Sequence, residues 1–87
     1  MVKVKFFNAS WCGPCQQMKP HMEQLVSEGY NVEFIDIDEF PSLAEEVQVR
    51  GVPTTTIYEN NELVERVVGY EDYDRLKKRI DIYQETK

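Results

Sequence analysis

Two cysteines close together are the residues of this sequence best suited to carry out chemistry. Cys12 and Cys15 are the only cysteines among 87 residues, with Gly13 and Pro14 between them and Trp11 before them. They lie at the start of an amphipathic stretch that predicts a helix. A thiol at a helix start faces free backbone N–H groups and the positive end of the helix dipole, which favour its thiolate form. Two thiols one turn apart can also close a small disulfide ring, so we interpret the pair as a reversible dithiol switch.

The same two cysteines could serve three other purposes. A closed zinc site needs four ligands, and His21 is the one further candidate nearby. A cysteine pair could also bridge an iron–sulfur cluster between two chains, although no feature of the sequence favours this. A static structural disulfide is disfavoured in a reducing compartment. We therefore expect no metal at the cysteines, and we expect His21 to be a solvated residue on the helix surface.

The residues around the cysteines predict the elements that position them. Residues 2–8 form a largely apolar strand, and residues 12–28 form a helix with one apolar face at helical spacing. Pro20 lies inside this helix and is expected to kink it, and Gly29 is expected to end it. Residues 32–37 are rich in β-branched and aromatic side chains, which predicts a second strand.

The second half of the chain predicts four further elements. Pro41 can begin a short helix, and residues 42–45 also fit a capping box. Asn60 and Asn61 suit a tight turn between strands at residues 54–58 and 63–68. Asp72 can cap a last helix whose apolar positions recur at helical spacing. The order is β-α-β-α-β-β-α, so we expect one α/β domain over residues 1–87, with a four-stranded mixed sheet and helices on both faces.

Composition and charge exclude several classes of function. Apolar residues make up 41% of the chain, which argues against disorder. The net charge of −6 and the pI near 4.7 oppose binding to nucleic acids and to anionic membrane surfaces. The N-terminus has no long apolar core of the kind found in signal peptides, and no run is long enough to span a bilayer. We therefore expect a cytoplasmic protein, and we expect it to be a monomer.

Two motifs together resemble those of one protein family. The run Trp-Cys-Gly-Pro-Cys at residues 11–15 matches the active-site motif of thioredoxins, and Arg-Gly-Val-Pro-Thr at residues 50–54 resembles their cis-proline loop. The resemblance covers nearly the whole chain, without the additional N-terminal strand and helix of ordinary thioredoxins. It implies a thioredoxin-like fold and a protein disulfide reductase. In such an enzyme Cys12 attacks a substrate disulfide and Cys15 resolves the mixed disulfide.

The resemblance also implies a substrate groove beside the cysteines. A cis peptide bond before Pro53 would place this proline against the cysteines and leave the backbone of Val52 free to pair with an extended substrate segment. Tyr70 would lie at the apolar rim of the groove. The candidate substrate-binding residues are Trp11, Gly13, Pro14, Val52, Pro53 and Gly69.

The family resemblance suggests partners as well. It implies disulfide-containing proteins as substrates and a flavin-containing thioredoxin reductase as electron donor. No bound cofactor is expected, because the disulfide between Cys12 and Cys15 is itself the redox centre. One alternative is a glutaredoxin-like or ribonucleotide-reductase redoxin, which the small size favours and the residues around the cysteines oppose. The other is a non-catalytic binding subunit in which the fold, rather than the thiols, serves a larger assembly.

The sequence departs from the family at a buried charged pair. Thioredoxins usually carry an aspartate six residues before the first cysteine and a lysine that accompanies it. In this chain these positions are Phe6 and Phe34, and we expect both members of the buried charged pair to be replaced by phenylalanine. Losing both charges together is physically coherent, because one buried charge without its partner is costly. We therefore expect water or the departing thiolate to take the proton of Cys15.

Overall fold

The computed structural model describes residues 1–84 and has the predicted element order. The elements are β1 (Val2–Asn8), α1 (Gly13–Ser27), β2 (Val32–Asp36), α2 (Pro41–Glu46), β3 (Thr54–Glu59), β4 (Glu62–Val68) and α3 (Tyr73–Gln84). The observed bounds of the four strands and of α1 lie within one residue of those that the sequence pattern predicts. No helix within residues 1–84 is both long enough and apolar enough to cross a membrane.

The four strands form one mixed sheet in the order β2-β1-β3-β4. Strand β1 pairs in parallel with β2 and antiparallel with β3, and β3 pairs antiparallel with β4. The turn between β3 and β4 consists of Asn60 and Asn61, whose φ angles are 53° and 71°. Asparagine tolerates this left-handed conformation, and two such residues in succession match the twist of a hairpin. The predictions of an α/β fold, a four-stranded mixed sheet and a tight turn at Asn60 and Asn61 are therefore confirmed.

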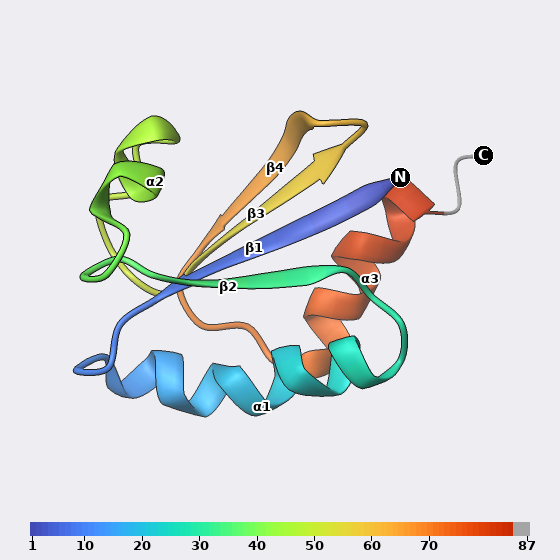
Figure 1. The fold of residues 1–87 in the computed structure, drawn as a ribbon. Helices are drawn as coiled ribbons and strands as arrows, with labels where there is room; N and C mark the ends of the chain where they lie inside the picture. The colour runs from blue at the N-terminus through green and yellow to red at the C-terminus, as the bar shows by residue number, and fades with distance from the viewer. Residues whose placement is uncertain (85–87) are drawn as a thin grey trace.

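Helices cover both faces of the sheet, as predicted. Figure 1 shows α1 and α3 on one side of the strands and α2 on the other. The larger core lies between the sheet and helices α1 and α3, where Phe6 packs with Met18, Met22 and Leu76. A smaller cluster under α2 contains Phe7, and successive residues of β1 therefore serve opposite faces. This alternation makes β1 the strand on which both layers are built.

The ends of the helices follow their local sequence signals. Cys12 is the N-cap of α1, with a proline in the first turn, and Gly29 follows the helix with a φ of 98°. The helix is continuous through Pro20. Pro41 begins α2, and Phe40 before it makes no side-chain capping bond, so the capping-box alternative for this helix is wrong. For α1, the cap at Cys12 and the turn at Gly29 set the two ends of the helix.

Helix α3 is joined to the loop before β2 by three polar side chains. Tyr30 donates a hydrogen bond to Asp81 at 2.6 Å, and Lys77 donates to the Tyr30 hydroxyl at 2.9 Å and to Asp81 at 3.0 Å. The hydrogen bond from Tyr30 holds the pKa of Asp81 below its ordinary value, with a further contribution from Lys77 and against the effect of burial. The ionised form of Asp81 therefore stabilises the fold.

A second polar cluster joins α3 to β4. Arg79 makes two hydrogen bonds to the carboxylate of Glu71, at 2.6 and 2.7 Å, and one to Glu65 at 2.6 Å. Glu71 is buried, and its pairing with a guanidinium supplies the partner that a buried carboxylate needs. Asp72 accepts a hydrogen bond from the backbone N–H of Arg75 at 3.0 Å, which confirms it as the cap of α3. The residues just before α3 are thus held by contacts to that helix.

We predict that Asp81→Asn lowers the free energy of unfolding by about 1 kcal/mol near neutral pH, because the carboxylate accepts charge-assisted hydrogen bonds. The folded-state pKa of Asp81 lies below the unfolded value of about 3.9. Its contribution is therefore full above that value and is lost as the pH falls through the folded-state pKa. Denaturant unfolding of the two proteins at a series of pH values measures the difference.

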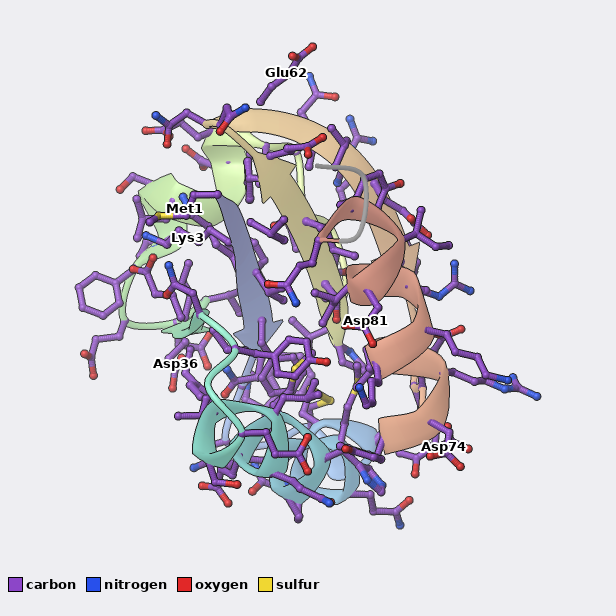
Figure 2. All side chains as sticks on the ribbon, turned by 90° about the vertical axis from the view of Figure 1, so that its right-hand side faces the viewer. Met1, Lys3, Asp36, Glu62, Asp74 and Asp81 are labelled. Carbon is purple, nitrogen blue, oxygen red and sulfur yellow. A yellow bond between two sulfur atoms is a disulfide. The ribbon has the colours of Figure 1, made fainter. Side chains whose placement is uncertain are left out.

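Asp74→Asn is the matched control on the same helix. Figure 2 shows Asp81 on the side of α3 that faces the strands, whereas Asp74 points away from them. Asp74 makes no side-chain hydrogen bond or ion pair within residues 1–84, so its loss should remove only a weak interaction with the helix dipole. If the effect of Asp81→Asn stays constant from neutral pH to below about pH 3, the assigned role of its carboxylate is contradicted.

Candidate redox site

The two cysteines lie where the short loop after β1 turns into α1. They form a disulfide with a Cα–Cα distance of 5.2 Å, and the backbone N–H of Cys12 donates to the carbonyl of Ala9 at 3.2 Å. Cys15 is the first residue on the buried face of α1, a face continued by Met18 and Met22. Cys12 is 5% exposed and Cys15 is 1% exposed. Both cysteines are therefore buried, and Cys12 is slightly more exposed than Cys15.

The start of α1 provides a polar environment for the sulfur of Cys12. The backbone N–H of Cys15 donates to Cys12 Sγ at 3.1 Å, while the carbonyl of Cys12 accepts from the N–H of Gln16 at 3.2 Å. Cys12 is therefore an N-cap whose sulfur occupies the position of a capping oxygen. A negative charge on this sulfur would be stabilised by that N–H and by the helix dipole. The arrangement favours a thiolate at Cys12 when the pair is reduced.

The turn before β3 lies against the same core. The peptide bond between Val52 and Pro53 is cis, as the family resemblance implied. Val52 packs against the buried cluster that contains both cysteines. The N–H of Gly69 donates to the carbonyl of Pro53 at 2.9 Å, so the end of β4 is joined to this turn. The backbone N–H and carbonyl of Val52 make no hydrogen bond within the described part of the chain.

Trp11 forms an exposed apolar surface beside the disulfide. Its side chain is 67% exposed, and its indole Nε1–H donates to Asp38 Oδ2 at 2.8 Å. Asp38 is positioned in turn by its own N–H, which donates to the carboxylate of Asp36 at 2.8 Å. Gly13 and Pro14 between the cysteines are also exposed. Sequence reasoning missed Asp38, because no local signal connects it with a tryptophan 27 positions earlier.

His21 has a partner that the sequence did not reveal. Its Nε2 lies 3.0 Å from the hydroxyl of Tyr70, and the two rings meet edge to face. The expectation of a simply solvated histidine is therefore wrong: His21 is partly buried and holds the residue after Gly69. Tyr70 is itself 46% exposed. The contact joins the middle of α1 to the loop between β4 and α3.

The phenylalanines that replace the expected charged pair differ in their environments. Phe6 is fully buried below α1. Phe34 is 37% exposed, so the second position of the replaced pair is much less buried than the first. It lies on β2, at the edge of the sheet, and packs edge to face on Phe6 with 5.8 Å between ring centroids. The edge position leaves one side of the Phe34 ring without a covering strand.

Residues that could bind a metal do not gather at this site. Within residues 1–84 there is no group of three or more histidine, cysteine, aspartate or glutamate side chains arranged to hold a metal ion. The redox-active group of the site is the pair of sulfurs, which exchange two electrons when they form or break their bond.

Comparison with known proteins assigns the chain to a family. The thioredoxin family model matches residues 1–82. The thioredoxin of Chlamydia trachomatis is 40% identical over 86 residues, which cover 97% of this chain and 83% of that protein. A mutant thioredoxin from Halobacterium salinarum superimposes with a TM-score of 0.93 at 44% identity, covering 99% of this chain and 77% of that one.

A more distant structure has the same fold. The thioredoxin of Fasciola hepatica superimposes with a TM-score of 0.87 at 27% identity, covering 94% of this chain and 80% of that one. Sequence and fold therefore lead to the same assignment over nearly the whole chain. We conclude that this chain belongs to the thioredoxin family and is a dithiol thiol–disulfide oxidoreductase.

Proposed function

We propose that the reduced protein reduces disulfides of other proteins, with Cys12 as the attacking thiolate and Cys15 as the resolving thiol. The Cys12 thiolate attacks one substrate sulfur, the substrate S–S bond breaks, and the other substrate sulfur leaves as a thiolate that takes a proton. Cys15 then attacks Cys12 Sγ, which forms the intramolecular disulfide and releases the second substrate sulfur. Two electrons pass from the dithiol to the substrate.

The hydrogen bond from the Cys15 N–H to Cys12 Sγ supports this order most directly. It gives one sulfur of the pair a donor that strengthens when the sulfur becomes negative. The more complete burial of Cys15 disfavours its thiolate, and this also makes Cys12 the sulfur that attacks first. Cys12 is therefore the better nucleophile, and Cys15 attacks only after the mixed disulfide has made Cys12 Sγ an electrophile.

The substrate segment is proposed to bind across the exposed turn next to the disulfide. The free backbone groups of Val52 can pair with an extended chain, as an additional strand would. Trp11 offers apolar contact area on one side, and Gly69 borders the turn through its bond to Pro53. Gly13 and Pro14 would lie beneath the bound segment. A thioredoxin reductase is the proposed electron donor, and a monomer in the cytoplasm is the proposed working form.

We predict that Cys15→Ser accumulates a stable mixed disulfide at Cys12, because the resolving sulfur is absent. Reaction of the reduced variant with an aromatic disulfide should release one coloured thiolate per chain, whereas the wild type should release two. Cys12→Ser is the matched variant and should release thiolate at least about tenfold more slowly, because its remaining thiol is buried. Faster attack by Cys15 than by Cys12 would reverse the proposed roles.

The proposed electron donor can be tested with the oxidised wild-type protein. We predict that NADPH with a thioredoxin reductase regenerates the dithiol. The measurement is the rate at which NADPH is consumed in the presence of a disulfide substrate. Glutathione with its own reductase serves as the parallel assay and should regenerate the dithiol at least about tenfold more slowly. Recovery with glutathione alone would instead support the glutaredoxin-like alternative.

A further inference from the structure

We propose that the Thr55 hydroxyl assists the resolving step by donating a hydrogen bond to the Cys15 thiolate, directly or through one water molecule. This inference rests on the proposed role of Cys15 as the resolving thiol. It identifies a polar group on the sheet below Cys15, where Phe6 offers none.

The chain topology places Cys15 over one particular pair of strand residues. Phe6 is the last residue of β1 in the buried cluster below α1, and Cys15 is the first residue on the buried face of that helix. Because α1 runs back along β1 after a short loop, the start of the helix lies over the end of the strand. Phe6 and Cys15 accordingly share one buried cluster.

The register of the sheet brings Thr55 to the same place. Thr55 pairs directly with Phe6 across the antiparallel ladder, and residues paired in this way point to the same face. The next pair along that face is Val4 with Ile57, and both belong to the cluster that contains the cysteines. The Thr55 side chain therefore projects into the layer between the sheet and α1.

Burial leaves the Thr55 hydroxyl without a partner of its own. Thr55 is fully buried, and its Oγ1 makes no hydrogen bond to any described residue. The preceding Thr54 differs, because its hydroxyl donates to the carbonyl of Gly51 at 2.7 Å. A buried hydroxyl without a partner is destabilising compared with the methyl of valine. A hydroxyl that gains a partner when the disulfide opens gives this position a use in the reaction.

The charged and titratable groups around this layer already have partners. On β4 the carboxylate of Glu65 accepts from Arg79, and Glu71 beyond the end of that strand accepts from the same guanidinium. On α1 the ring of His21 is joined to Tyr70. Helix α3 contributes leucine and isoleucine to the cluster. Among residues 1–84, the Thr55 hydroxyl is thus a buried donor without a partner on the face of the sheet below Cys15.

The proposed step keeps protons and electrons in balance. The Cys15 thiol gives its proton to the departing substrate thiolate, and its sulfur forms the bond to Cys12 Sγ. The Thr55 hydroxyl keeps its own proton and turns it toward the developing negative charge on Cys15. The bond from the hydroxyl is stronger to a thiolate than to a thiol, so it lowers the pKa of Cys15 in the reduced protein.

The chain offers a matched pair of variants for the test. Thr55→Val removes the hydroxyl and keeps the shape of the side chain. Thr56→Val makes the same change one residue later, where the hydroxyl is equally buried and unpartnered but faces the opposite side of the sheet. Thr55→Ser restores a hydroxyl at the first position. Cooperative thermal unfolding of each variant establishes that it is folded.

The readout is the release of the second coloured thiolate when each reduced variant reacts with an aromatic disulfide, followed over a range of pH. We expect Thr55→Val to slow this release about fivefold and to move its pH profile upward, because one hydrogen bond to the reacting sulfur is lost. We expect Thr56→Val to resolve at the wild-type rate and Thr55→Ser to restore most of the rate. First thiolate release should be unchanged in all three.

Two results would overturn the inference while leaving the proposed function intact. One is a second release by Thr55→Val at the wild-type rate and with the wild-type pH profile. The other is an equal slowing by Thr56→Val, which would show a general effect of core packing. A wild-type chain that releases no second thiolate would contradict the resolving role of Cys15 itself, and the role of Thr55 would fall with it.

Discussion

The hydrogen bond from the backbone N–H of Cys15 to Cys12 Sγ is the interaction on which the function of this structure depends. It exists because β1 ends at Asn8 and α1 begins at Gly13, so that the loop between them makes a cysteine the N-cap. One local feature thereby sets two properties of the dithiol. It directs a backbone donor to the first sulfur, and it turns the second sulfur into the core.

The remainder of the fold holds this helix start in place and supplies the surface on which we propose that substrates bind. The alternation of β1 sends Phe6 below α1 and Phe7 below α2, so one strand supports both layers. The hydrogen bond from the Gly69 N–H to the carbonyl of Pro53 joins the end of β4 to the turn before β3. Ion pairs of α3 with β4 then fix the segment that follows Gly69.

Features encoded locally could be predicted from the sequence, and long-range contacts could not. The cysteine motif, the hairpin at Asn60 and the cap at Asp72 each depend on residues within one turn of the chain. The bond between Trp11 and Asp38 joins residues that only the fold brings together.

The environments of Phe34 and His21 could not be predicted from the sequence, for reasons that the fold makes clear. Phe34 is partly exposed because β2 lies at the edge of the sheet, and strand order is not contained in the hydrophobic pattern of a single strand. His21 was expected to be solvated because its position on the helix gave no sign of Tyr70, which lies 49 residues later.

The most direct test of this account is the pH dependence of alkylation of the reduced wild-type protein, with the modified residue identified by mass spectrometry. The hydrogen bond at the helix start predicts that Cys12 reacts first, with a midpoint below the ordinary thiol value of about 8.5. Cys15 should react at higher pH and more slowly, because it is buried. Equal reactivity of both cysteines with midpoints near the ordinary value would contradict the account.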